Sequence, residues 1–241
     1  MLLQSDNASD VKLKLESTTE GRKREFEGLL LEGMGSPSIG VVMLHGRNGS
    51  PDGAVVSNLR RSLNEIGYTT LSLQNPLPQG GDEFADYMND VRQENYVFRE
   101  ASARIRAAIS EVKNRGATAI VLLGFSMGAR MHSAFLSLGE PTALPIVGFI
   151  ALSIGTNGIQ QLDSTTTLNQ VRVPVLDVYG EGDADVAKSA SARKSAYEAG
   201  QGKAYTQVMI SGSVPHNFAG AEEQLDSKVR GWIMALVPVT K

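Results

Sequence analysis

The segment that decides the fold runs from Ala119 to Gly128 and reads AIVLLGFSMG. Its apolar beginning is typical of a buried strand, and the residues from Met127 onward have the pattern of a helix. The chain must therefore turn sharply at Ser126, where a side chain at Gly124 or Gly128 would collide with neighbouring backbone. This arrangement predicts that the Ser126 hydroxyl stands exposed above a sheet edge, as a nucleophile must.

Buried strands and amphipathic helices alternate along the rest of the chain. The expected strands are residues 11–15, 26–31, 40–44, 69–73, 119–123, 146–152, 173–179 and 205–210. The expected helices are residues 54–66, 87–114, 127–138, 159–169, 186–199 and 219–236. This alternation predicts an α/β fold with a mostly parallel central sheet and helices on both faces.

We expect a single domain over residues 1–241, in which residues 1–38 form a polar leader and an N-terminal edge hairpin. Two helices and two strands already occupy the interval from Ser126 to Asp183, so no separate cap domain fits there. Any lid must come from the segment Asn75 to Asp90, where prolines and glycines interrupt regular structure.

The composition narrows the classes of partner and chemistry. The 23 basic and 26 acidic residues give a net charge of -3 and no basic block, so we expect no nucleic-acid partner. The chain has no cysteine, which excludes disulfides, a thiolate nucleophile and cysteine-based zinc sites, and we expect neither a metal nor a cofactor. The oligomeric state is not predicted.

The start of the chain and its hydropathy bear on the cellular compartment in which the protein is expected. No window approaches the roughly 20 apolar residues of a membrane span. The apolar stretch at the N-terminus is too short for a signal peptide. We therefore favour a cytoplasmic protein, with a periplasmic or secreted one as the alternative if an export signal has been removed.

A serine nucleophile needs a base within hydrogen-bond reach, and the chain offers three histidines. His132 lies nearly two turns after Ser126 on the predicted helix, which indicates a packed or surface residue. His45 lies in a tight turn, where a histidine commonly braces the loop. His216 follows the last predicted strand and precedes the final helix, and we expect it to be the base.

The acid that orients this base is expected between serine and histidine in chain order, at the end of a strand. The segment 180–185 reads GEGDAD, and Asp183 occupies its tight-turn position. Asp185 and Glu181 are rivals, although each also fits a solvated or helix-capping carboxylate. Asp177 lies within the strand and is a weak candidate.

Attack on a carbonyl creates an oxyanion, which requires preorganised donors. The backbone N–H of Met127, at a helix N-terminus next to the nucleophile, is one expected donor. The second is the backbone N–H of Arg47, in the loop after the first central strand. A simple glycine turn explains that loop equally well.

Together these segments resemble the α/β-hydrolase superfamily over residues 39–236. The short layout without a cap is most similar to its dienelactone hydrolase and carboxylesterase branch, although dienelactone hydrolases usually have cysteine where this chain has Ser126. The resemblance implies a Ser126–Asp183–His216 triad that cleaves carboxylic esters or thioesters of small molecules.

Two other functions stay open at this point. One is a non-catalytic binding protein on the same fold, and the other is a peptidase or amidase. The residues that bind the substrate are not predicted, because the apolar candidates fit the core equally well. These candidates are Leu77, Phe84, Tyr87, Met88, Phe125 and Met127.

Overall fold

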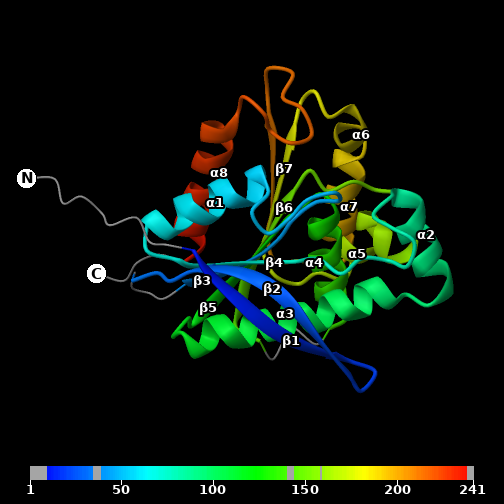
Figure 1. Ribbon diagram of the computed structural model, residues 1–241. Helices are drawn as coiled ribbons and strands as arrows, with labels where there is room; N and C mark the ends of the chain where they lie inside the picture. The colour runs from blue at the N-terminus through cyan, green and yellow to red at the C-terminus, as the bar shows by residue number, and fades with distance from the viewer. Residues whose placement is uncertain (1–9, 35–38, 140–143, 158, 238–241) are drawn as a thin grey trace, which may run out of the picture.

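The computed structural model describes residues 10–34, 39–139, 144–157 and 159–237. Eight strands form a single sheet in this structure (Figure 1). The strand order is β1-β2-β4-β3-β5-β6-β7-β8. The antiparallel pairs are β1 with β2 and β2 with β4, and the remaining neighbours are parallel. The strands are β1 (Val11–Thr19), β2 (Arg22–Leu31), β3 (Ile39–Leu44), β4 (Thr69–Leu73), β5 (Ala119–Phe125), β6 (Ile146–Leu152), β7 (Val175–Gly180) and β8 (Tyr205–Ile210). The mostly parallel sheet confirms the predicted fold class.

Helices cover both faces of this sheet. The helices are α1 (Ala54–Glu65), α2 (Phe84–Gln93), α3 (Tyr96–Asn114), α4 (Met127–Ser137), the 3-10 helix η2 (Gln160–Leu162), α5 (Ser164–Leu168), α6 (Ala184–Ala187), α7 (Ala190–Ala199) and α8 (Glu222–Leu236). In Figure 1, α1 and α8 lie together on one face, while α3 and α4 pack on the other. Among the described residues, no helix is both long and apolar enough to cross a bilayer.

The central strands serve both layers because side chains alternate along a strand. In β3, Val41 and Met43 pack with α1 and α8, whereas Val42 and Leu44 pack with α3 and α4. Every residue of β3 is buried. A strand covered on both faces reads as a continuous apolar run, which is why the sequence shows it so clearly.

The structure corrects the expectation of one helix over residues 87–114. The chain breaks at Asn95, whose backbone is left-handed at φ 51°. The carbonyl of Asp90 accepts hydrogen bonds from the N–H groups of Glu94 and Asn95, and the Asp90 carboxylate accepts one from Val97 at the start of α3. Asparagine tolerates the left-handed conformation, so two helices meet at an angle here.

Two other expected helices are also divided. In the segment 159–169, the Asp163 side chain caps a short α5 by accepting from the N–H of Thr165 at 3.2 Å. In the segment 186–199, the hydroxyl of Ser189 donates to the carbonyl of Val186 and separates α6 from α7. Short polar side chains that bond to nearby backbone compete with helix continuation, which the apolar pattern alone does not reveal.

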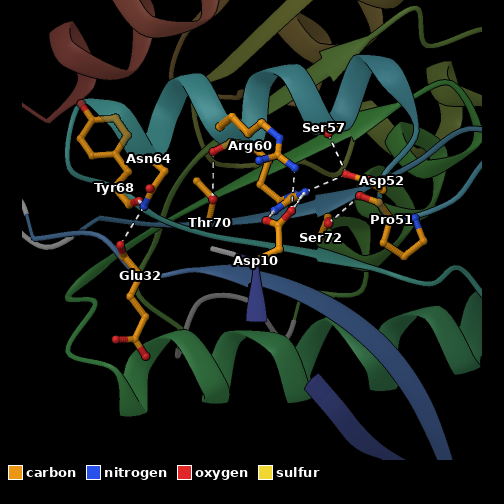
Figure 2. A network of polar contacts seen from close by, with 11 residues as sticks. Asp10, Glu32, Pro51, Asp52, Ser57, Arg60, Asn64, Tyr68, Thr70 and Ser72 are labelled. Atoms are coloured by element: carbon orange, nitrogen blue, oxygen red, sulfur yellow. Dashed lines mark hydrogen bonds and ion pairs between the residues drawn. The ribbon is translucent and has the colours of Figure 1, made fainter. Parts of the chain in front are cut away.

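Asp10, just before β1, is held to α1 by the buried cation of Arg60 (Figure 2). The side chain of Arg60 is completely buried and forms ion pairs with Asp10 and Asp52. The hydroxyl of Ser57 donates to the same Asp52 carboxylate at 2.7 Å. The two carboxylates supply the charge that a buried guanidinium requires.

Candidate active site

The three predicted triad residues meet at one edge of the sheet. Ser126 follows β5, Asp183 follows β7, and His216 lies in the loop after β8. These strands are parallel, so their carboxyl ends lie at the same edge. Residues far apart in the chain are thereby placed next to one another.

The turn at Ser126 has the strained geometry that the sequence predicts. Its backbone lies at φ 53° and ψ −110°, outside the regions that ordinary residues favour. A Cβ atom at Gly124 would lie 2.5 Å from the backbone nitrogen of Ala129, and one at Gly128 would lie 2.6 Å from the carbonyl oxygen of His45. Only glycine fits at both positions, so the strand can approach the helix closely enough to make the turn.

Hydrogen bonds connect the three side chains in series. His216 Nε2 lies 2.9 Å from Ser126 Oγ, and His216 Nδ1 lies 2.6 Å from Asp183 Oδ2. A carboxylate only accepts, so Nδ1 carries the proton that is donated to Asp183. Nε2 is then left as the acceptor for the Ser126 hydroxyl. This tautomer is the one that general-base activation of a serine needs.

Two further residues position the histidine loop. The sequence pattern singled out Glu181 only as a rival acid and did not single out Ser153. The hydroxyl of Ser153, just after β6, donates to the carbonyl oxygen of His216 at 2.8 Å. The Glu181 carboxylate accepts from the N–H groups of Gly212 and Ser213 at 2.7 and 3.2 Å. The backbone hydrogen bond from Gly212 contributes most to lowering the pKa of Glu181 below its usual value. Ser153 could have been found from the sequence, because it follows a predicted strand at the edge where functional residues gather.

The rival carboxylates lie in other surroundings. Asp185 is exposed and pairs with Lys188 at 2.5 Å. Asp177 is fully buried in β7, where it accepts from Arg193 Nε at 2.9 Å and from the Tyr205 hydroxyl at 2.7 Å. Of the four acidic candidates, the structure brings only Asp183 within hydrogen-bond distance of His216.

The other two histidines have separate environments. His45 Nδ1 donates to the carbonyl of Gly46 at 2.7 Å, and its Nε2 accepts from the N–H of Asn75 at 3.2 Å. Burial lowers the pKa of His45, so the neutral ring braces this loop. His132 is completely buried, edge-on to Phe149 at 6.2 Å, and burial lowers its pKa to about 3. It is a neutral core residue.

The triad opens into a cavity of about 550 Å³, a volume suited to a small molecule. Both predicted oxyanion donors, Arg47 and Met127, line this cavity together with Ser126. Met127 is the first residue of α4, where the helix dipole favours negative charge. The arrangement therefore places an electropositive helix end next to the serine.

The apolar candidates for substrate binding separate into different groups. Phe84 and Met127 line the cavity. Tyr87 is 1% exposed and belongs to the core, whereas Leu77 is 46% exposed. Phe125 packs beside the His216 ring, with 5.3 Å between ring centroids. The sequence could not distinguish these environments because all of the side chains are apolar.

No cluster of three or more histidine, aspartate or glutamate side chains within the described ranges is arranged to hold a metal ion.

Comparison with solved structures shows that the chain has the α/β-hydrolase fold. Est1E from Butyrivibrio proteoclasticus is 16% identical, with a TM-score of 0.67 over 92% of this chain and 98% of its own. Dienelactone hydrolase from Anabaena variabilis is 17% identical, with a TM-score of 0.67 over 94% and 98% of the two chains. XC6422 from Xanthomonas campestris, described as an α/β serine hydrolase without a lid, is 18% identical, with a TM-score of 0.62 over 96% and 97%.

Comparison by sequence gives a more specific assignment. A search of curated proteins gave no match. Residues 85–235 match the family described as protein of unknown function DUF3530. This match covers more than half of the chain and includes Ser126, Asp183 and His216. The protein therefore belongs to the DUF3530 family and has the α/β-hydrolase fold.

Proposed function

We propose that this protein is a serine hydrolase that cleaves carboxylic esters or thioesters of small molecules through an acyl-enzyme intermediate. The observation that carries the proposal is the hydrogen-bonded series Asp183–His216–Ser126, with distances of 2.6 and 2.9 Å. A buried carboxylate, an imidazole in the correct tautomer and a hydroxyl at a strained turn together constitute an activated nucleophile.

In the first half of the reaction, Ser126 Oγ attacks the carbonyl carbon while His216 Nε2 takes the hydroxyl proton. The carbonyl oxygen becomes an oxyanion, which the backbone N–H groups of Met127 and Arg47 stabilise. The intermediate collapses as the bond to the leaving oxygen or sulfur breaks. His216 gives its proton to that atom, and the alcohol or thiol departs.

In the second half, His216 takes a proton from water as the water oxygen attacks the acyl-enzyme carbonyl. A second oxyanion forms and collapses, the bond to Ser126 Oγ breaks, and His216 returns the proton to the serine. Asp183 stays ionised throughout and stabilises the imidazolium. The products are a carboxylic acid and the free enzyme.

A fluorophosphonate probe tests the nucleophile directly, because it labels activated serines. We expect the wild-type protein to be labelled at Ser126, and Ser126→Ala to be unlabelled. Ser137, on the same helix, donates to the carbonyl of Ala134 and provides the matched control Ser137→Ala, which should label normally. A wild-type protein that is folded but unlabelled, and inactive on p-nitrophenyl acetate, would favour the non-catalytic alternative.

A further inference from the structure

A partly buried arginine lies one helical turn after the candidate nucleophile. Arg130 follows Ser126 by four positions, and its N–H donates to the Ser126 carbonyl at 3.2 Å. Ser126 is the residue before α4, and Arg130 lies in the first turn of that helix. Both residues line the same cavity. A group bound by Arg130 would therefore lie only a few bonds from the carbonyl that Ser126 attacks.

Arg130 forms no ion pair within the described part of the protein. Its guanidinium donates to the carbonyl of Leu162 at 2.5 Å and lies 5.4 Å from the centre of the Phe84 ring. No carboxylate of the described residues lies within ion-pair distance of it, in contrast to the buried Arg60 and Arg193. Burial lowers the pKa of Arg130 to about 10; the Asp163 carboxylate acts against this shift, and the charges of Arg47 and Arg193 add to it. An anion in the cavity would compensate this charge.

The neighbouring backbone makes room for this side chain. A Cβ atom at Gly155 would lie 2.6 Å from Arg130 Nη2. Gly155 lines the same cavity, so the absence of a side chain there admits the guanidinium.

A second polar group in the cavity lacks a partner. The amide nitrogen and oxygen of Asn157 are both buried, and neither has a hydrogen bond within the described residues. Asn157 lines the cavity beside Arg130. Buried amides in folded proteins are almost always hydrogen bonded, so this one points to a group that a ligand supplies.

Arg47 adds positive charge on the same side of the cavity. Its guanidinium lies 5.8 Å from the centre of the same Phe84 ring. It is already engaged, because it donates to the carbonyl of Asp82 at 3.2 Å and lies 3.5 Å from the Glu83 carboxylate. Arg130 is therefore the residue that can bind an anion directly, and Arg47 adds to the positive electrostatic potential in the cavity.

From this arrangement we infer that the substrate carries a carboxylate on its acyl part, which Arg130 and Asn157 bind within the catalytic cavity. The inference rests on the proposed function, because it assigns the substrate class of that site. The acyl part is specified by the position of His216, which protonates the leaving group. His216 contacts Asp183 and Phe125, whereas Arg130 contacts Leu162 and Phe84, so we place the anion away from His216 and the leaving group.

A matched pair of substrates tests this inference. The 4-nitrophenyl monoester of adipic acid carries a carboxylate four methylenes from the reacting carbonyl, and methyl 4-nitrophenyl adipate has the same chain without the charge. With spontaneous hydrolysis subtracted, we expect the wild-type protein to have a kcat/KM about ten- to a hundredfold higher for the charged ester, as one charge-assisted hydrogen-bonded contact provides. Equal or lower kcat/KM for the charged ester would overturn the inference.

Variants of Arg130 separate binding from structure. Arg130→Gln should remove the preference for the charged ester, because it lowers kcat/KM for the charged ester more than for the methyl ester, whereas Arg130→Lys should restore part of the preference. The control Arg99→Gln removes the same charge from an exposed arginine that pairs with Glu20. It should leave the preference intact. A loss of both activities in equal proportion would mean that Arg130 is only structural.

A binding measurement decides the question even if the protein does not turn over either ester. Monomethyl adipate and dimethyl adipate can be titrated calorimetrically into Ser126→Ala, with and without Arg130→Gln. Binding of the monoanion that is lost in the Arg130→Gln background supports the anion site independently of catalysis. No binding of the monoanion to Ser126→Ala would refute the anion site. If the wild-type protein hydrolyses the neutral ester, the proposed function then stands without it.

Discussion

His216 Nε2 lies 2.9 Å from Ser126 Oγ, although the two residues are 90 positions apart in the chain. The distance follows from the parallel sheet, which places the end of β5 and the loop after β8 at the same edge. Because the serine backbone is fixed by the turn and the histidine loop by Ser153 and Glu181, the pair is held in position before any substrate binds.

The first prediction concerns the triad as a unit. Ser126→Ala and His216→Ala should each lower kcat for p-nitrophenyl acetate by on the order of 10⁴- to 10⁶-fold, because either change removes the activated nucleophile. The double variant should be about as slow as either single variant. Circular dichroism should show that all three proteins remain folded. A Ser126→Ala protein with wild-type turnover would contradict the assignment.

The second prediction compares two neighbouring carboxylates. In Asp183→Asn, the amide would donate to His216 Nδ1 and leave Nε2 protonated, so the ring could no longer accept the serine proton. We expect a loss in kcat of about 10⁴-fold. Asp185→Asn is the matched control, because this exposed residue contacts Lys188 and not His216. A greater loss in Asp185→Asn than in Asp183→Asn would reassign the acid.

The third prediction concerns the glycine of the turn. A Cβ atom at position 128 would meet the backbone carbonyl oxygens of Leu44 and His45, which cannot move without shifting β3 and its loop. Gly128→Ala should lower the free energy of unfolding in urea by about 1–3 kcal/mol. The control is Gly231→Ala within α8, where a Cβ atom meets nothing within 4 Å. That change should raise stability by about 0.4–1 kcal/mol, since alanine restricts the unfolded chain. Similar effects of the two changes would contradict the steric argument.

The fourth prediction concerns pH and the ion pair in Figure 2. The hydrogen bond from Arg60 holds the pKa of Asp10 below its ordinary value of 3.8. A carboxyl with a depressed pKa in the folded state contributes stability above its unfolded pKa, and this contribution is lost as the pH falls through the folded value. Asp10→Asn should therefore be less stable than wild type at pH 7, and the difference should narrow as the pH falls below 3.8.

Urea unfolding of the two proteins at a series of pH values measures this difference. Glu16→Gln is the control, because Glu16 forms an exposed pair with Lys23 that contributes little. A difference between Asp10→Asn and wild type that stays constant with pH would show that the Asp10 charge is not the cause.

The sequence by itself determined the order of strands and helices, the turn at Ser126 and the positions of the two residues that follow strand ends, Asp183 and His216. These features are local. A buried strand has a period of two, a sharp turn next to a helix requires glycine, and residues after parallel strands share one edge. None of them depends on knowing how distant segments pack.

Tertiary structure alone decided which neighbours each polar group obtained. The carboxylates at Asp177, Asp183 and Asp185 lie within nine consecutive residues, yet one is buried against Arg193, one bonds His216 and one faces solvent. The breaks at Asn95 and Ser189 likewise depend on side-chain hydrogen bonds rather than on the apolar pattern. Arg130 lies beside Ser126 without a carboxylate partner among the described residues because of how α4, η2 and α2 pack. The burial of a side chain and the compensation of its charge depend on segments that are far apart in the chain, so no local sequence pattern encodes them.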